Sequence, residues 1–79
     1  MEFLILGPLT KLAYTIDWLE VETDQGNFVI CPGHAPMILL LAVNKEVIFS
    51  LSNGKQDQLL IKNGILAIDR LQATLFINE

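Results

Sequence analysis

The sequence predicts an all-β fold, a two-sheet sandwich or flattened barrel of about nine or ten short strands. Apolar and polar residues alternate with a period of two, as in Leu19–Glu22, and this is the period of a half-buried strand. Turn-forming pairs such as Asn53-Gly54 interrupt these segments about every ten residues, a spacing typical of sandwiches. So many short strands in 79 residues can bury their apolar sides only against a second sheet.

The first half of the chain is expected to contain five strands. Residues that favour turns separate them, at Gly7-Pro8, Asp24–Asn27 and Pro32-Gly33. The stretch Met37–Val43 is apolar throughout, so it alone is also compatible with a helix. The expected strands are 2–6, 11–16, 18–23, 27–31 and 37–42.

The second half is expected to form a meander of four strands. Asn53-Gly54 predicts a hairpin, because Asn-Gly readily adopts the positive φ that two-residue hairpin turns need. Asn63-Gly64 turns the chain again, and Asp69-Arg70 precedes the last strand. The expected strands are 46–52, 57–62, 65–68 and 73–78.

The composition predicts one small folded domain spanning residues 1–79. Of these residues 52% are hydrophobic and 18% are charged, which is richer in apolar residues than an ordinary globular chain. A domain of this size buries only about 60–65% of the surface that its unfolded chain exposes. We therefore expect a folded core with apolar surface left over, of the kind that commonly marks a docking face.

The net charge of −4 argues against a nucleic-acid partner, because the five basic residues are dispersed without any run. Acidic residues instead gather in one segment, which would attract a basic partner surface. The alternative is that Glu20 and Glu22 are solvated positions on the outer face of a strand, and both descriptions can hold together. The acidic residues of this segment are Asp17, Glu20, Glu22 and Asp24.

No segment is expected to enter a membrane. The longest apolar run, Met37–Val43, is far shorter than the ~20 residues of a membrane-spanning helix. The N-terminus lacks the basic region of a secretory signal, and the single cysteine, Cys31, can form no internal disulfide. We expect an intracellular protein whose association with any membrane is indirect.

Cys31 and His34 are the residues that come closest to a chemical motif. Zinc needs three or four protein ligands, and the chain has no other cysteine or histidine, so a metal site is not favoured. Catalysis by a thiol requires thiolate character, whereas Cys31 follows the apolar segment Phe28–Ile30. We therefore expect a buried, inert cysteine. The His34 side chain is expected either to fix its loop by a hydrogen bond or to serve in docking.

The remaining polar residues predict neither catalysis nor a cofactor. Glu20 and Glu22 lie on one face of a strand and could in principle act as general acid and base, but nothing nearby distinguishes an acid from a base. Trp18 lies on the same side of the strand as Glu20 and Glu22. It is either an outer-face anchor for a partner or a core residue at the sandwich edge. No glycine-rich phosphate loop is present.

Two motifs in register resemble one family. The pattern Gly26-x-Phe28-x-Ile30-x-Pro32-Gly33-His34-Ala35-Pro36 is similar to the glycine, apolar and Pro-Gly-His-Ala-Pro pattern in the N-terminal β-sandwich of the epsilon subunit of F-type ATP synthases. Asn63–Ile68 resembles a later segment of that domain, at nearly the same distance downstream. With Phe3–Leu6 and Leu19–Thr23 as further matches, the resemblance covers essentially the whole chain.

In that family the sandwich is a non-catalytic part of the rotor's central stalk. It docks on the gamma subunit and touches the membrane c-ring, and so couples ion translocation to ATP synthesis. The resemblance implies these partners, no cofactor, and a peripheral position on the cytoplasmic face of the energy-coupling membrane. The loop Gln25–Pro36 would lie toward the ring. The candidate interface residues are Glu20, Gln25, Asn27, His34 and Met37.

The chain departs from the family pattern at several positions. Ala42-Val43-Asn44 occupies the region of a usual Lys-Pro-Gly turn, and Asn27 stands where an acidic residue is common. A glycine of the second turn is replaced around Tyr14-Thr15. The family also continues beyond the position of Glu79 into a helical hairpin that regulates ATP hydrolysis. Without that hairpin we expect neither ATP binding nor inhibition by that route.

These departures leave a second function open. The chain could be a stand-alone β-sandwich interaction module that has lost the ring-docking role. Another protein would then bind the face of Trp18, Glu20 and Glu22, or the apolar strand Met37–Leu41. A cysteine-dependent enzyme using Cys31 and His34 is the least favoured function.

Overall fold

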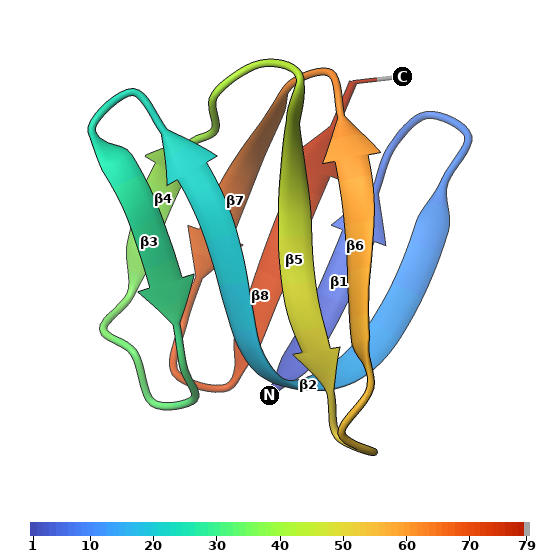
Figure 1. Cartoon of the computed structure of the whole chain (residues 1–79), viewed down its shortest axis with the longest axis vertical. Helices are drawn as coiled ribbons and strands as arrows, with labels where there is room; N and C mark the ends of the chain where they lie inside the picture. Colours follow the sequence, from blue (N-terminus) through green and yellow to red (C-terminus); the bar gives the residue numbers. More distant parts are fainter. Residues whose placement is uncertain (79) are drawn as a thin grey trace.

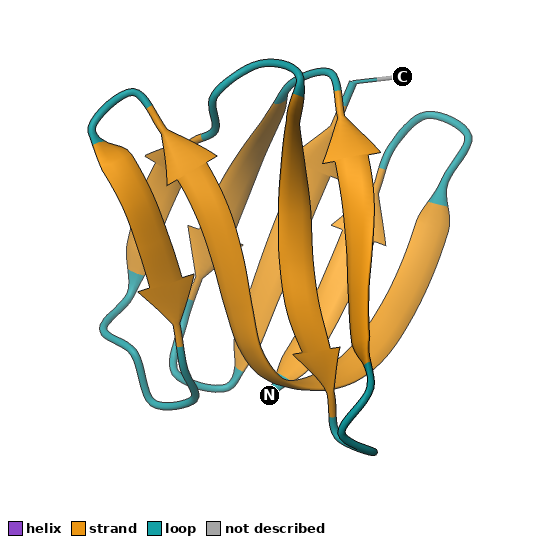
Figure 2. Cartoon of the chain, viewed as in Figure 1, coloured by secondary structure: helices purple, strands orange, loops and turns teal. Residues whose placement is uncertain are grey.

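The computed structural model describes residues 1–78, which form eight β-strands in two packed layers (Figure 1 and Figure 2). Every pair of neighbouring strands is antiparallel except β1 with β8. Within these residues no helix is long and apolar enough to cross a membrane. The strands are β1 (Glu2–Leu6), β2 (Lys11–Thr23), β3 (Gly26–Ile30), β4 (Met37–Leu40), β5 (Lys45–Leu51), β6 (Gln56–Ile61), β7 (Gly64–Ile68) and β8 (Gln72–Ile77).

The strands divide into two sheets, which confirms the predicted sandwich. Neighbouring strands follow the order β4-β7-β8-β1-β2-β5-β6, and β3 pairs with β2. Sheet A contains β4, β7, β8, β1 and the first half of β2, and sheet B contains β3, the second half of β2, β5 and β6. Sheet B lies in front of sheet A in Figure 1.

Strand β2 explains why there are slightly fewer strands than expected. We predicted two strands in this part of the chain, but it forms one strand of 13 residues. Its pairing shifts between Ile16 and Trp18, and such a bulge bends a strand. Ile16 is buried before the shift and Leu19 after it, so the bulge also changes which positions face the core. One bent strand can thereby belong to both sheets.

The expected meander of the second half is wrong at one connection. β5 pairs with β6 and β7 pairs with β8, as a meander requires. β6 and β7 are not paired, because the turn at Asn63 takes the chain from sheet B to sheet A. The second half therefore contributes one hairpin to each layer.

The apolar stretch Met37–Val43 begins as a strand, β4, and not as a helix. β4 pairs with β7 at the edge of sheet A. The chain then crosses toward sheet B, where Leu41 bridges to Thr23 and the Ala42 N–H donates to the Glu22 carbonyl at 2.9 Å. These contacts close one side of the sandwich.

The core lies between the sheets and is apolar. Phe49 of sheet B contacts two rings of sheet A, with centroid distances of 5.1 Å to Phe3 and 5.0 Å to Tyr14. Aromatic pairs at such distances stabilise a core beyond the area they bury. The buried hydrophobic residues are Phe3, Ile5, Ile16, Leu19, Val21, Ile30, Leu41, Val47, Phe49, Ile61, Leu66, Ile68, Ala73 and Leu75.

The hairpin predicted at Asn53-Gly54 is confirmed, with a longer loop than a two-residue turn. The Leu51 N–H donates to the Lys55 carbonyl at 2.7 Å, and the Lys55 N–H donates to Asn53 Oδ1 at 2.9 Å. Gly54 has a φ of 88°, whereas Asn53 is not among the residues with positive φ. One left-handed glycine at the end of a three-residue loop is a common hairpin geometry.

Candidate partner-binding surfaces

Asn27 joins two of the acidic side chains on the outer face of sheet B. Its Nδ2 donates to Glu20 Oε2 at 3.0 Å and to Glu22 Oε1 at 2.7 Å. Asn27 is paired with Glu22 in the β2–β3 register, and Val29 is paired with Glu20. The amide therefore holds both carboxylates in place, and the structure brings the candidate residues Glu20 and Asn27 together.

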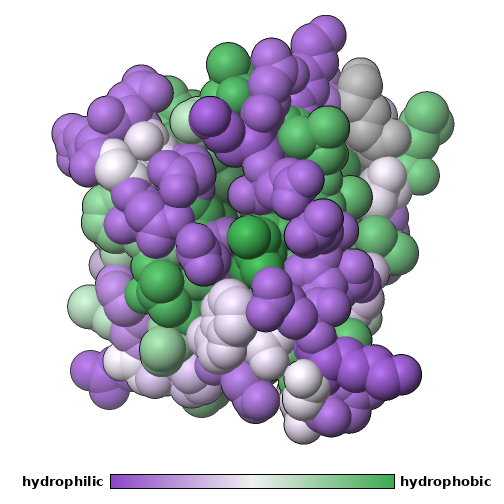
Figure 3. All heavy atoms as spheres, in the orientation of Figure 1, coloured by the Kyte–Doolittle hydropathy of each residue, from purple (hydrophilic) through white to green (hydrophobic). Residues whose placement is uncertain are grey.

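The rest of this outer face is a mixture of polar and apolar side chains, as Figure 3 shows. Trp18 is half-buried and has no place in the core cluster, which favours the outer-face alternative for this residue. Val29 and Leu60 are 54% and 67% exposed. The face therefore offers apolar contacts beside the two carboxylates that Asn27 holds.

Gln25 and His34 lie at opposite ends of β3. Gln25 is in the β2–β3 turn, where its N–H donates to Thr23 Oγ1 at 3.1 Å, and His34 is in the β3–β4 loop (Figure 1). A strand of five residues spans about 17 Å. The candidate residues Gln25 and His34 therefore do not form one compact site, although both lie along the edge of the sandwich that β3 forms.

His34 makes hydrogen bonds within its own loop, in agreement with the structural alternative for this residue. The ring Nδ1 of His34 is 2.8 Å from the Ala35 carbonyl oxygen. The backbone N–H of His34 donates to the Cys31 carbonyl at 3.2 Å. The neighbouring Gly33 N–H donates to the Arg70 carbonyl at 3.1 Å, which ties this loop to the β7–β8 turn. The loop is therefore braced against sheet A.

The expectation that Cys31 is buried is wrong. Cys31 is an exposed residue with a free thiol. Ile30 is buried and Val29 is 54% exposed, so the alternation of the strand turns the next position, Cys31, outward. No group of three or more His, Cys, Asp or Glu residues within residues 1–78 is placed to hold a metal ion.

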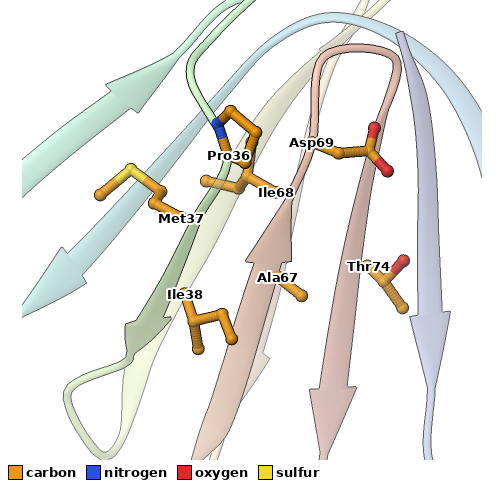
Figure 4. Close-up of a pocket in the computed structure, with 7 residues that line it drawn as sticks. All are labelled: Pro36, Met37, Ile38, Ala67, Ile68, Asp69 and Thr74. Carbon is orange, nitrogen blue, oxygen red and sulfur yellow. The ribbon is translucent and has the colours of Figure 1, made fainter.

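Met37 is half-buried at the start of β4 and lines a shallow hollow of about 480 Å³ (Figure 4). It is paired with Ile68 and packs partly against the core. Asp69 at the rim holds the β7–β8 turn, because its Oδ1 accepts from the N–H groups of Leu71 and Gln72 at 2.9 and 2.8 Å. The hollow is lined by Pro36, Met37, Ile38, Ala67, Ile68, Asp69 and Thr74.

The outer face of sheet A carries a continuous apolar surface, which we call the apolar face. One row crosses the sheet from Ile38 in β4 to Ala13 in β2, and a second row runs from Leu40 to Leu6. Ile38 and Leu40 are 75% and 69% exposed. The apolar face consists of Leu4, Leu6, Ala13, Ile38, Leu40, Ile65, Ala67, Thr74 and Phe76.

Among the candidate interface residues, none lies on the apolar face. A signal for it was present in the sequence, because Phe3–Leu6, Met37–Leu40 and Ile65–Ile68 are apolar at every position. Such strands place hydrophobic side chains on both sides of a sheet. The sequence pattern does not show that these three strands lie in one sheet.

A family model matches most of the sequence. Residues 9–79 match the model described as ATP synthase, Delta/Epsilon chain, beta-sandwich domain. The comparison with curated proteins found no match.

Two solved structures have the same fold. A chain in the cryo-EM structure of the Euglena gracilis mitochondrial ATP synthase, comprising OSCP, F1 and c-ring, aligns with a TM-score of 0.83 at 15% identity over 95% of this chain. A chain from the central stalk and c-ring of the Tetrahymena thermophila mitochondrial ATP synthase aligns with a TM-score of 0.84 at 10% identity over 100% of this chain. The alignment spans 48% of the first chain and 63% of the second.

Proposed function

The chain belongs to the family of ATP synthase delta/epsilon β-sandwich domains, and on that basis we propose that it is a non-catalytic subunit of the rotor's central stalk. In this role it docks on the gamma subunit and the c-ring of an F-type ATP synthase and helps to couple ion translocation to ATP synthesis. It is peripheral on the energy-coupling membrane through the complex, and residues 1–79 act as one domain.

The observation that carries this proposal is the apolar face of sheet A. Exposed apolar patches of this kind on a small domain commonly mark a protein interface. Phe76 is 48% exposed near the middle of this face, and Ile38 is 75% exposed toward its edge. An aromatic and aliphatic centre of this type supplies most of the binding energy in many interfaces. We assign this face to the gamma subunit.

The edge formed by β3 is the part that we assign to the c-ring. Asn27 and His34 both lie along this edge, about the length of the strand apart. The loop that carries His34 is braced by the hydrogen bond from Gly33 to Arg70, so it would keep its shape under load. A close-packed sandwich transmits strain well, which suits a part that connects two partners without doing chemistry.

A tagged copy of the chain, recovered from gently solubilised native membranes and analysed by mass spectrometry, tests this function. We expect the gamma and ring subunits to be recovered with it. Phe76→Glu should abolish the recovery of gamma, because it places a carboxylate at the centre of the apolar face. Leu60→Glu is the matched control, because Leu60 is exposed on the opposite sheet. An intact ATP synthase that lacks this chain would contradict the proposal.

The second candidate is a stand-alone interaction module, and the outer face of sheet B favours it. There Asn27 holds Glu20 and Glu22 at defined positions, next to the half-buried Trp18. A partner with basic side chains would be attracted to these carboxylates. The same recovery experiment separates the two functions, since this module would bring down a different protein, and Glu20→Gln with Glu22→Gln would abolish that recovery.

A further inference from the structure

We propose that β3 binds an extended segment of a partner protein as an additional strand of sheet B. In this segment basic and apolar residues alternate, and the basic ones lie on the outer side of the sheet. The proposal rests on the proposed function, which assigns this edge to a partner in the complex, and it adds how the edge binds and what chemistry it recognises.

β3 forms an open edge of sheet B, at the left of Figure 1. It pairs with β2 alone, and backbone groups in an antiparallel pair point alternately toward and away from the neighbouring strand. The Glu22 carbonyl accepts from the Ala42 N–H at 2.9 Å, so it points away from β3. Glu22 and its partner Asn27 are therefore a pair without backbone hydrogen bonds. The backbone N–H and C=O of Asn27, and those of Val29 two residues further, point to the open edge.

The opposite edge of sheet B is protected. β6 pairs with β5 alone, and the N–H of Gln58 in β6 donates to Asp57 Oδ1 at 2.8 Å instead of to a strand. Charged residues on an edge strand are a common protection against pairing with another chain. β3, Gly26–Ile30, has no charged residue. Of the two edges of this sheet, β3 is therefore the one that remains able to accept a strand.

A hollow beside β3 provides space for apolar side chains. It has a volume of about 290 Å³ and is lined by residues of β3, β4 and the β2–β3 turn. Its apolar lining consists of Phe28 from β3 and of Ile38, Leu39 and Leu40 from β4. Every second side chain of a strand added beside β3 would point to the inner side of sheet B, where this hollow lies. Apolar residues are therefore expected at these positions of the partner segment.

The outer side of the same edge is negatively charged. Asn27 Nδ2 holds the carboxylates of Glu20 and Glu22 at 3.0 and 2.7 Å, and within residues 1–78 neither carboxylate forms an ion pair with a basic side chain. The backbone of an added strand would lie two strand spacings, about 10 Å, from that of β2. A long Lys or Arg side chain and a Glu side chain together span this distance. Charge complementarity therefore argues for basic residues on the outer side of the partner segment.

A blocked synthetic peptide in which Arg and Val alternate is a direct probe of this edge. In a titration of the isotope-labelled chain followed by NMR, we expect the amide signals of Asn27 and Val29 to shift and their hydrogen exchange to slow. A peptide of alternating Glu and Val should not bind. N-methylation of one alternate set of peptide nitrogens should abolish binding and that of the other set should be tolerated, because only one set faces β3. Equal tolerance of both sets, or shifts confined to β6 or sheet A, would overturn the inference.

Val29→Pro tests the backbone of β3 in the same titration. It removes an outward N–H without removing a bond to β2, as proline does when it is tolerated on an edge strand. We expect the peptide to bind at least ~10-fold more weakly, whereas Val29→Ala should bind nearly as the wild type does. Gln58→Pro in β6 is the matched control and should leave binding unchanged. Thermal unfolding verifies that each variant is folded, and a folded Val29→Pro with wild-type affinity would contradict strand addition.

The charge preference is tested without altering the backbone. Glu20→Gln with Glu22→Gln should weaken peptide binding roughly 5-fold at low ionic strength, and added salt should reduce the difference. The same affinity in both chains at low ionic strength would contradict the predicted basic residues.

The outcomes separate this inference from the stalk function. A chain that binds no Arg-Val peptide at millimolar concentration would overturn strand addition and leave the stalk function standing, because that function is tested by the recovery of gamma and ring subunits. Peptide binding at β3 without recovery of these subunits would reject the stalk function alone.

Discussion

Asn27 holds two like charges side by side. It donates to both Glu20 and Glu22, and such bonds to charged groups are among the stronger ones, though solvent weakens them at an exposed site. We expect Asn27→Ala to cost about 1 kcal/mol of unfolding free energy, or roughly 4–8 °C in Tm, measured by thermal unfolding. Asn27→Asp should cost more, because it adds a third carboxylate, and salt should reduce the difference. Wild-type stability for Asn27→Asp would contradict this account.

Cys31 is an exposed thiol in a braced loop. Because the residue is exposed in the folded chain, we expect it to react completely with a thiol-specific reagent such as a maleimide without prior unfolding. Cys31→Ser should abolish the labelling and change the stability by less than about 0.5 kcal/mol, the range of ordinary surface substitutions. Mass spectrometry of the labelled chain measures the result. Labelling that required denaturant would show the thiol to be buried.

The turn between β4 and β5 depends on a left-handed residue. Asn44 has a φ of 55°, a conformation that asparagine tolerates better than most residues, and its N–H donates to the Lys62 carbonyl at 2.9 Å. We expect Asn44→Ala to cost about 1 kcal/mol, because alanine is strained there. Asn44→Gly should cost little or nothing, since glycine adopts this φ freely. Denaturant unfolding measures both, and equal losses would contradict the strain argument.

The start of β7 leaves little room for a side chain. A Cβ on Gly64 would lie 3.0 Å from the Phe76 carbonyl oxygen and 3.2 Å from Leu75 Cδ1. The nearest of these atoms is backbone, so the strand pair itself would have to shift. We expect Gly64→Ala to cost about 1–3 kcal/mol. Asn63→Ala, in the same turn, is the control and should cost much less. A fully stable Gly64→Ala would contradict the close approach of β7 and β8.

Stability of the whole molecule depends on contacts between the sheets. Phe49 is buried and joins sheet B to Phe3 and Tyr14 of sheet A. We expect Phe49→Ala to cost about 3–5 kcal/mol, a large part of the stability of a domain this small. Calorimetry should show a Tm lower by at least about 15 °C.

We expect the wild-type chain to unfold in one cooperative transition, because one core cluster contains residues of both sheets. Two separate transitions would contradict the single-domain description. Leu60→Ala is the control for Phe49→Ala, since Leu60 is 67% exposed and should change the Tm by only a few degrees.

The sequence alone determined most of the strands, most turns and the family. A period of two is a local property, so it shows which residues of Leu19–Glu22 share a side of their strand. Turn chemistry is also local, and it predicted the hairpin at Asn53-Gly54. The two motifs in register carried the resemblance, which the family match over residues 9–79 supports.

Only the tertiary structure decided which strands are neighbours, because strand pairing joins residues far apart in the sequence and periodicity contains no information about the partner. The bulge between Ile16 and Trp18 lets β2 belong to both sheets. The alternation of side chains along β3 places Cys31 on the outside. Pairing of β2 with β3 set Asn27 between two carboxylates. The order β4-β7-β8-β1 gathered the strands with apolar residues on both sides into one sheet, and this created the apolar face.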